Sequence, residues 1–448
     1  MTDTPVFSKY TIFSKIRDSE NFFLVNLLTG NADILPPDKA REITERRYTD
    51  TEEYLRKGYL VHPEEEKKLF NRKYLDFLDA RANDEIQLFF VPWYHCNFSC
   101  SYCYQSGYAR HDEKLSTDTI DAFFSFIGHE FAGRRKYITL FGGEPLMPDV
   151  LSRERIGYLI EQAERRSLGV AVVTNGYTLT EYMPLFEKAF IREIQVTLDG
   201  PEKMHNLRRP LKNGGETFAR ISEGIDAALA RDITVNLRVV LDRENISALP
   251  ELAAFAVEKK WTEHPRFKTQ LGRNYELHFC QGNRNRLFER AGMYEELYRM
   301  ARENPEILRF HRPAFSITRF LAETGTLPEA LFDSCPGCKT EWAFDHTGKI
   351  FPCTATVGKD GREIGTFYPT VTKNTAAIGN WQDRDVTAIA ACRDCALQLA
   401  CGGGCAAVAE NTAGSILAPD CRPVKELIEM GMSLYCIVGS KQIPCFIV

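Results

Sequence analysis

The sequence has neither long apolar runs nor blocks of basic residues. No apolar run reaches about 18 residues, roughly the length needed to cross a bilayer. The N-terminus, MTDTPVFSKY, lacks the basic patch and apolar core of a secretion signal. The net charge is −5 at pH 7, and without a basic block a nucleic-acid partner is not indicated. We therefore expect a cytoplasmic protein that binds neither membranes nor nucleic acids.

Length and composition indicate a globular protein with more than one core. The chain has 448 residues, of which 44% are hydrophobic and 26% charged, so two or three domains are expected. Fourteen cysteines need an explanation, because a reducing cytosol does not favour structural disulfides. Their clustered C-x2-C and C-x3-C spacings indicate metal or iron–sulfur ligation instead.

Three cysteines lie on one short loop, spaced Cys96-x3-Cys100-x2-Cys103. They directly follow the apolar residues 86–93, which are typical of a buried strand running into a loop. Three thiolates can hold three irons of a [4Fe–4S] cube and leave the fourth without a protein ligand, whereas an electron-transfer cluster normally takes four cysteines. A zinc loop or three unlinked buried thiols are the alternatives.

This spacing resembles the signature of the radical S-adenosylmethionine (SAM) enzymes, and Tyr102, just before the last cysteine, fits the same pattern. The resemblance implies that the free iron binds the amino and carboxylate groups of SAM, and that an electron from the cluster cleaves it. Cys96, Cys100 and Cys103 would then be both the cluster ligands and the centre of catalysis.

Strands alternate with helices after the cysteine loop. Six strands are predicted, at residues 86–93, 137–141, 169–174, 193–199, 233–241 and 275–280. Helical segments lie between most of them, for example at residues 117–131, 153–167 and 218–231. The alternation predicts a parallel sheet in an α/β fold. The resemblance makes this sheet a partial (β/α)6 TIM barrel, in which functional residues belong at the carboxyl ends of the strands.

The sequence Gly142-Gly143-Glu144-Pro145 ends the second predicted strand. Glycines let a backbone approach a ligand closely, and Glu144 could accept a hydrogen bond from an ammonium group. In radical SAM enzymes the matching segment holds the amino group of SAM. Taken alone, such a sequence is often only a turn.

The fourth strand ends in residues 197–201 (TLDGP), followed by His205 and Arg209. This resembles the S-x-D-G…H-x-x-x-R stretch of peptide- and protein-modifying members, with Thr197 in place of serine. By position, Thr197 would contact the ribose or methionyl end of SAM, and Arg209 its carboxylate. Two residues of the fifth strand are further candidates for SAM binding: Asn236 and Arg238. Each alone could equally be a solvated or capping residue.

Cysteines return near the C-terminus with the spacing Cys335-x2-Cys338-x9-Gly348-x4-Cys353, then Cys392-x2-Cys395-x5-Cys401-x3-Cys405-x15-Cys421. The spacing resembles the SPASM domain of radical SAM enzymes, which implies two auxiliary [4Fe–4S] clusters. One would be held by Cys335, Cys338, Cys353 and Cys405, and the other by Cys392, Cys395, Cys401 and Cys421. Structural zinc is the alternative, because C-x2-C pairs also bind it. The remaining cysteines, Cys280, Cys436 and Cys445, have no assigned role.

Four domains are predicted. Residues 1–62 contain short strands and two helices in an order that resembles a winged-helix domain, in which a leader peptide adds a strand to a sheet edge. The alternative for this unit is a structural cap on the next domain. Residues 63–85 form a helical linker, residues 86–330 the barrel, and residues 331–448 the SPASM domain.

The resemblance implies a radical SAM/SPASM peptide maturase with SAM and three [4Fe–4S] clusters. Its substrate would be a ribosomally made precursor peptide, its product a thioether or a carbon–carbon or carbon–oxygen cross-link, and its electron donor a protein such as flavodoxin or ferredoxin. An enzyme like the anaerobic sulfatase maturases, or one of cofactor biosynthesis, is the alternative. In the sulfatase maturases a catalytic aspartate follows the cysteine that matches Cys353, but here Thr354 stands there and cannot serve as a carboxylate base. A non-enzymatic zinc scaffold or adaptor is the third hypothesis.

Overall fold

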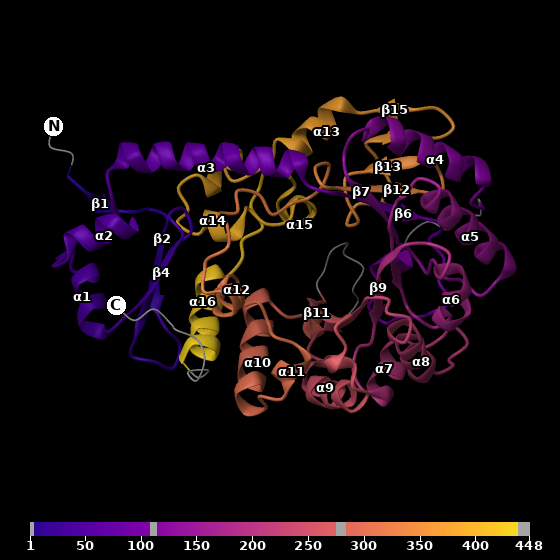
Figure 1. The fold of residues 1–448 in the computed structure, drawn as a ribbon, viewed down its shortest axis with the longest axis horizontal. Coiled ribbons are helices and arrows are strands. Elements are labelled where there is room, and N and C mark those ends of the chain that lie inside the picture. Colours follow the sequence, from indigo (N-terminus) through magenta and orange to yellow (C-terminus); the bar gives the residue numbers. More distant parts are fainter. Residues whose placement is uncertain (1–3, 108–113, 275–283, 438–448) are drawn as a thin grey trace.

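The computed structural model describes residues 4–107, 114–274 and 284–437. A small N-terminal unit lies at the left of Figure 1, and the long helix α3 (Pro63–Asn83) runs along the top from it. A large α/β part lies at the right, with the C-terminal helices between the two. In the described part of the chain, no helix is both long and apolar enough to cross a membrane.

The N-terminal unit is built on a three-stranded antiparallel sheet in the order β2-β3-β4. Its strands, together with the short pair β1 and β5, are β1 (Val6–Phe7), β2 (Thr11–Lys15), β3 (Phe22–Asn26), β4 (Asn31–Leu35) and β5 (Leu60–Val61). Two helices, α1 (Pro37–Thr44) and α2 (Thr51–Lys57), follow β4. The predicted order of strands and helices is confirmed. Strand β1 escapes prediction because two residues carry no recognisable alternation.

Helix α3 joins the N-terminal unit to the rest of the protein. It begins with Pro63 and three glutamates, which favour a helix N-terminus. Its Phe70, Tyr74 and Phe77 rings lie 5.1 to 5.5 Å from the ring of Phe332, which belongs to the C-terminal region. The helix is therefore held by aromatic packing against a segment about 250 residues later in the chain.

The described residues also form a ten-stranded sheet in the order β11-β10-β9-β8-β7-β6-β12-β13-β14-β15. The run from β11 to β12 is parallel throughout. Its strands are β6 (Ile86–Val91), β7 (Lys136–Leu140), β8 (Val170–Thr174), β9 (Ile191–Thr197), β10 (Val235–Leu241), β11 (Phe267–Arg273) and β12 (Glu341–Asp345). The predicted α/β class with a mostly parallel sheet is confirmed.

Helices cover the outer face of this sheet: α4 (Thr117–Glu130), α5 (Val150–Glu164), α6 (Leu179–Phe186), α7 (Glu202–Arg208), α8 (Phe218–Leu229) and α9 (Leu249–Glu258). Outward side chains of the strands are apolar and buried; Phe90, for example, lies 4.7 Å from the Phe123 ring of α4. The alternate, inward positions carry polar residues such as Gln87 and Glu193. Strand alternation therefore places polar chemistry in the lumen of the barrel.

Five of the six predicted strands are confirmed to within two residues at their starts and ends. The sixth, predicted at residues 275–280, lies outside the described residues, as does Cys280. A parallel strand occurs at β11, in a segment where the sequence predicted no strand. The sequence of β11, FKTQLGR, is largely polar because this strand is the last of the sheet among the described residues, so it has no apolar run to reveal it.

The C-terminal region extends the same sheet rather than standing apart from it. Strand β12 pairs in parallel with β6, and three short antiparallel strands follow: β13 (Lys349–Phe351), β14 (Gly365–Thr366) and β15 (Thr372–Lys373). The helices that complete the fold are α10 (Arg290–Glu303), α11 (Ile307–Phe310), α12 (Thr318–Thr324), α13 (Thr375–Gln382), α14 (Gln398–Cys401), α15 (Ala406–Ala413) and α16 (Val424–Met432). The sheet thus continues across the predicted boundary at residue 331, and the four domain ranges stay predictions.

Helix α16 packs against the N-terminal sheet. Ile12 and Phe23 share one buried apolar cluster with Ile428 and Met432. The backbone N–H of Arg17 donates to the carbonyl of Glu429 at 3.3 Å. This contact covers the β2 side of the small sheet, whereas β4 pairs only with β3 among the described strands.

Candidate active site

The three-cysteine loop is packed backbone to backbone on the loop that follows β7. Gly143 N–H donates to the Trp93 carbonyl at 3.2 Å, and Glu144 N–H donates to the His95 carbonyl at 3.0 Å. A Cβ on Gly143 would lie 2.0 Å from the His95 oxygen, so only glycine fits. Gly142 has a φ of +135° and is equally restricted. The Gly-Gly pair therefore sets the position of the cysteine loop at the carboxyl end of the barrel.

The thiols of this loop lie in a partly buried setting near one another. Burial raises the pKa of Cys96 to about 12, with further increases from the charges of Glu144, Cys100 and Cys103. Burial also raises the pKa of Cys100 to about 11, although the nearby Arg209 opposes the increase. The free thiols of Cys96 and Cys100 are therefore protonated at neutral pH, and a metal that binds these two thiols must displace protons.

Glu144 is buried, with 1% of its surface exposed. Its carboxylate accepts hydrogen bonds from Leu146 N–H at 2.8 Å, from Thr174 Oγ1 at 2.6 Å and from Asn175 N–H at 2.6 Å. Burial raises the pKa of Glu144 to about 7, against the lowering effect of these hydrogen bonds. The carboxylate fastens the ends of β7 and β8 together, and its contact with the amino group of SAM stays a prediction.

Tyr102 and Arg209, far apart in sequence, meet beside the cysteine loop. Arg209 Nη1 donates to Tyr102 OH at 2.6 Å, and Tyr102 OH donates to the Asp199 carboxylate. Burial disfavours the charge of Arg209, but Cys100, Tyr102 and Asp199 hold the pKa of its guanidinium above the usual value. Thr197, 7% exposed, ends β9 two residues before Asp199. The structure thus brings Tyr102, Thr197 and Arg209 to the same end of the barrel as the cysteines.

Four residues that support this arrangement were not assigned from the sequence. Asp199 N–H donates to His205 Nδ1 at 3.2 Å, and the buried Arg208 forms an ion pair with Asp242 at 2.9 Å. Asp199 and His205 were visible in the quoted motif, but their part in holding the loop was not. Asp242 has no local sequence signal, because its contact to Arg208 spans 34 residues.

Asn236 and Arg238 point into the lumen from β10. Asn236 Nδ2 donates to Glu193 Oε1 at 2.9 Å, and Arg238 Nη1 donates to Gln270 Oε1 at 3.4 Å. Arg238 lines a cavity of about 180 Å³ that extends to Phe89 and Thr354. The backbone of Arg238 lies beside Thr197, because the parallel pairing of β10 with β9 aligns these two residues. The side-chain partners of Asn236 and Arg238 lie on β9 and β11, and SAM contacts from either residue stay a prediction.

The C-terminal cysteines fall into two neighbourhoods. Burial raises the pKa of Cys353, and Glu341, Cys335 and Cys405 raise it further. Burial and the neighbouring Cys335 also raise the pKa of Cys338. In the other neighbourhood, burial raises the pKa of Cys392 to about 11, with added effects of Cys401, Cys395 and Cys421. The thiols that influence one another are those placed in the same predicted ligand set.

The turn at residues 402–404 supports both neighbourhoods. Its glycines have φ values of 62°, 74° and 72°, and a Cβ on Gly404 would lie 2.0 Å from the Asp420 carbonyl oxygen. The buried Arg384 donates to the carbonyls of Gly403 and Gly404 at 2.9 and 3.0 Å. A single guanidinium thus donates to two carbonyls of the glycine turn, and the Gly403 carbonyl also accepts from the Asp420 N–H at 3.1 Å.

Two further observations concern possible metal ligands and the remaining cysteines. Within the residues that the structure describes, no three His, Cys, Asp or Glu side chains converge closely enough to hold a single metal ion. Cys436 is buried with its Sγ 3.7 Å from Met432 Sδ. Cys445, like Cys280, lies outside the described residues.

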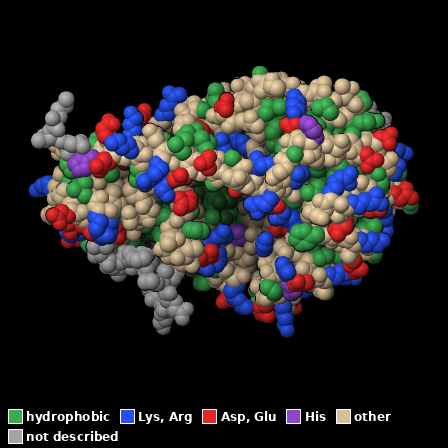
Figure 2. All heavy atoms as spheres, turned by 45° about the horizontal axis from the view of Figure 1, so that its top comes forward, with side chains coloured by type: hydrophobic (Ala, Val, Ile, Leu, Met, Phe, Trp, Pro, Cys, Tyr) green, Lys and Arg blue, Asp and Glu red, His purple; other side chains and the backbone are tan. Residues whose placement is uncertain are grey.

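The face drawn in Figure 2 is hollowed near its middle, with Lys and Arg side chains beside the hollow. A cavity of about 620 Å³ lies between the N-terminal unit, α10, α12 and the C-terminal loops. Its lining combines apolar residues such as Phe320 and Leu427 with Arg273, Arg290 and Arg422. This volume is in the range of sites that enclose small ligands, about 300 to 1,000 Å³.

Comparison with known proteins identifies the central part of the chain. Residues 90–256 match the family model described as the Radical SAM superfamily. The GTP 3′,8-cyclase of Rhizobium etli is 33% identical over 172 residues, which cover 36% of this chain and 45% of that protein. The probable GTP 3′,8-cyclase of Methanopyrus kandleri is 31% identical over 158 residues, covering 35% and 48%. The chain thus spans about half the length of the curated relatives it matches.

Solved structures extend the similarity in fold over most of the chain. The structure of anSMEcpe, a sulfatase maturase, with bound AdoMet has a TM-score of 0.61 at 18% identity, covering 81% of this chain and 97% of that chain. SuiB of Streptococcus suis has a TM-score of 0.50 at 14% identity, covering 92% and 98%. The expected partial-barrel fold is therefore confirmed. The superfamily match supports an enzyme that uses SAM and a [4Fe–4S] cluster. Residues 90–256 of this chain form a radical SAM domain.

Proposed function

We propose that this protein is a radical SAM/SPASM maturase that installs a cross-link in a ribosomally made precursor peptide. The observation that carries the proposal is the pairing of a three-cysteine loop at the mouth of the barrel with two four-cysteine neighbourhoods in the C-terminal region. An enzyme that forms a cross-link removes two hydrogen atoms from its peptide. Additional redox centres beside the radical site suit such an oxidation better than they suit a redox-neutral rearrangement.

The donor atoms fit the groups that the family implies. Cys96, Cys100 and Cys103 would hold three irons of the SAM-binding cluster, because three neighbouring thiols on one loop leave the fourth iron free. When bound, this cluster and SAM supply hydrogen-atom abstraction from an unactivated carbon, and two auxiliary clusters supply an acceptor for the second electron. The auxiliary ligands would be Cys335, Cys338, Cys353 and Cys405 for one cluster, and Cys392, Cys395, Cys401 and Cys421 for the other.

The chain's own residues bind and orient SAM in this proposal. The backbone of Gly142 and Gly143 and the carboxylate of Glu144 lie beside the cysteine loop, where they would face the amino group of SAM. The guanidinium of Arg209, held by Tyr102, would pair with the SAM carboxylate, because arginine forms strong charge-assisted hydrogen bonds to carboxylates. Thr197 would donate its hydroxyl to the ribose or methionyl part.

The N-terminal unit would bind the leader of the precursor. Strand β4 (Asn31–Leu35) has a neighbour on one side only among the described strands, so its free edge can accept an added peptide strand. The shared core with α16 also supports the alternative of a structural cap, and both roles are compatible. The structure of anSMEcpe with bound AdoMet and the Cp18Cys peptide, at a TM-score of 0.61, supports a peptide substrate for this fold.

Two other functions compete with this proposal. The curated matches favour a GTP 3′,8-cyclase, although they cover less than half of this chain. The fold is also that of a sulfatase maturase, but the residue after Cys353 is Thr354, whose N–H and hydroxyl donate to Glu341 Oε1 at 2.7 and 2.9 Å. A threonine hydroxyl is no carboxylate base at neutral pH.

The test is made on protein purified without oxygen and supplied with SAM and reduced flavodoxin or ferredoxin. We expect iron and sulfide for three clusters, and a mass loss of two hydrogens on a short cysteine-bearing precursor encoded beside this gene. Formylglycine on a sulfatase peptide, or SAM-dependent consumption of GTP, would refute the proposal in favour of a competing function. Zinc in place of iron and sulfide would remove all the enzyme hypotheses.

A further inference from the structure

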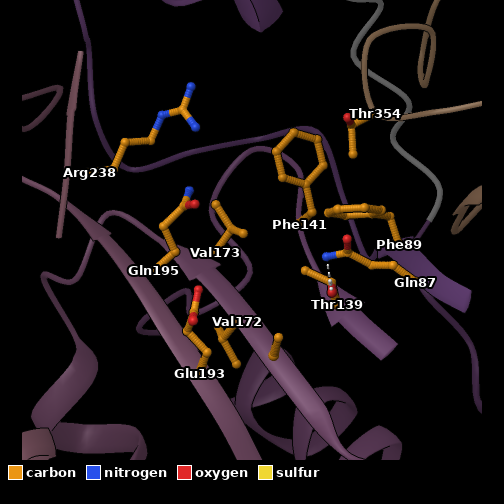
Figure 3. Close-up of a pocket in the computed structure, with 11 residues that line it drawn as sticks. Gln87, Phe89, Thr139, Phe141, Val172, Val173, Glu193, Gln195, Arg238 and Thr354 are labelled. Atoms are coloured by element: carbon orange, nitrogen blue, oxygen red, sulfur yellow. Dashed lines mark hydrogen bonds between the residues drawn. The ribbon is translucent and has the colours of Figure 1, made fainter. Parts of the chain in front are cut away.

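The lumen of the barrel contains a cavity with two unlike sides. It measures about 180 Å³, which is below the usual range of about 300 to 1,000 Å³ for pockets that enclose a whole ligand. Phe89 and Phe141 lie on one side together with Gln87, whereas Gln195 and Arg238 lie on the other beside Val173 (Figure 3). The size and lining fit a polar side chain attached to a larger, partly apolar substrate.

The charges on the polar side are not balanced. Glu193 accepts from Asn236 Nδ2 at 2.9 Å and pairs with Lys268 at 3.2 Å, so its carboxylate is already satisfied. Arg238 has a hydrogen bond to the neutral Gln270 at 3.4 Å, and among the described residues no carboxylate lies within ion-pair distance of it. The cavity therefore presents one guanidinium without a counter-charge.

The guanidinium of Arg238 lies against strand β11. A Cβ on Gly272 would lie 3.0 Å from Arg238 Nη2, so the guanidinium rests on the strand surface that Gly272 leaves bare. Strand β11 is the outermost described strand on this side of the sheet, four strands away from β7, whose following loop packs on the cysteine loop. Arg238 also faces Phe89 and Phe141 across the cavity in Figure 3. Arg238 aligns with Thr197 of β9 in the sheet, but its guanidinium reaches toward β11 and the cavity, where it can contact a substrate side chain.

We propose that Arg238 binds a carboxylate of the substrate peptide and thereby selects which residue enters the lumen. This inference rests on the proposed function and names the chemistry of the substrate: a carboxylate next to an apolar group. The carboxylate can belong to an acidic side chain or to the C-terminus of the peptide. The planar guanidinium offers two parallel N–H donors that match the two oxygens of a carboxylate, which a carboxamide cannot reproduce.

The expected selectivity follows from the cost of an unpaired charge in a confined site. A guanidinium that loses water on substrate binding needs an anionic partner to replace it. Hydrogen bonds to charged groups are worth about 1.5 to 3 kcal/mol, which corresponds to an affinity ratio of about 10 to 150. We therefore expect the carboxylate form of a ligand to bind at least about 10-fold more tightly than its carboxamide.

The experiment measures binding by isothermal titration to the full-length, cluster-reconstituted protein with SAM. Four probes are used at millimolar concentration: acetyl-Phe-Glu-amide, acetyl-Phe-Gln-amide, acetyl-Ala-Phe with a free C-terminus, and acetyl-Ala-Phe-amide. Preference for the first over the second assigns an acidic side chain, and preference for the third over the fourth assigns the C-terminus. Equal affinity within both pairs, or no binding of any probe, would overturn the inference.

Three variants sharpen the result. Arg238→Gln should abolish the preference and leave the SAM affinity unchanged. Gly272→Ala should weaken the preference severalfold, because the added Cβ displaces the guanidinium without removing its charge. Arg266→Gln is the matched control, since Arg266 pairs with Asp232 on the surface. Loss of SAM affinity in Arg238→Gln with an unchanged preference would return Arg238 to the SAM site and refute the proposal.

The two proposals fail differently. If wild-type protein cross-links a precursor peptide but does not discriminate carboxylate from carboxamide, only the role of Arg238 is wrong. If it discriminates between the probes but acts on GTP or on a sulfatase peptide, the proposed maturase function is wrong and the carboxylate site remains.

Discussion

Replacing Gly143 by alanine tests whether the loop after β7 positions the three-cysteine loop. The new Cβ would lie 2.0 Å from the His95 carbonyl oxygen and 2.6 Å from that of Tyr94. Both neighbours are backbone atoms, so no side-chain rotation relieves the clash. The two loops must separate by about 1.4 Å to reach an ordinary contact of 3.4 Å.

The cost can be worked from the contacts that this separation breaks. Two backbone hydrogen bonds, from Gly143 to Trp93 and from Glu144 to His95, hold the loops together. Each is worth about 1 kcal/mol, and overpacking adds about 1 to 3 kcal/mol. We expect a destabilisation of about 3 to 5 kcal/mol, or a cysteine loop displaced by more than 1 Å in a protein that stays folded.

The assay combines denaturant unfolding with iron analysis after anaerobic reconstitution. Gly143→Ala should lose the SAM-binding cluster and keep the C-terminal ones, falling from about 12 irons per chain to about 8. The matched control is Gly128→Ala in α4, where a Cβ meets nothing within 4 Å. Full iron content together with unchanged stability in Gly143→Ala would refute the packing argument.

Three other predictions address separate parts of the protein. Cys100→Ala should abolish SAM cleavage while about 8 irons per chain remain, by iron analysis and electron paramagnetic resonance; cleavage by this variant would contradict the ligand assignment. Burial raises the pKa of Glu144 from 4.5 to about 7, so the folded state binds its proton more tightly than the unfolded state. Stability of the cluster-free protein should therefore fall as pH rises from 4.5 to about 7, by up to about 3 kcal/mol; urea titrations that are equally pH-dependent for Glu144→Gln would exclude this. Precursor binding should slow amide exchange in Asn31–Leu35, and unchanged exchange there would end the leader-binding hypothesis.

The parts of the fold that could be predicted are those with a strong local pattern. Residues 86–93 and 169–174 are mostly apolar because their outward side chains are buried under helices, so they identify β6 and β8. Strand β11 lacked this signal because, among the strands that the structure describes, it is the outermost one and its sequence is largely polar. Strand β12 could not be foreseen, because its pairing with β6 depends on contacts about 250 residues away in the chain.

The candidate site also contains some residues that the sequence could indicate and others that it could not. The resemblance to the SPASM domain implied which thiols belong together, and the thiols that influence one another's pKa lie within those sets. Contacts between side chains on different strands of the barrel left no comparable pattern in the sequence. The pairing of Arg208 with Asp242, and the unbalanced charge of Arg238, depend on which strands are neighbours. The spacing of residues within one segment does not show which strands lie next to each other in the sheet.

The connection between β6 and β12 makes the barrel and the C-terminal region parts of one site. Parallel pairing aligns Glu341 with Gln87, and the following hairpin brings Thr354 to the wall of the same lumen cavity that Arg238 lines. At the other end of β12, Asp345 accepts a hydrogen bond from Tyr94 OH of the cysteine loop at 2.7 Å. A side chain held by Arg238 would therefore lie in a cavity whose opposite wall is one residue from Cys353. Because the same sheet fixes the cysteine loop, the carboxylate site and Cys353, a substrate residue positioned by one is positioned relative to all three.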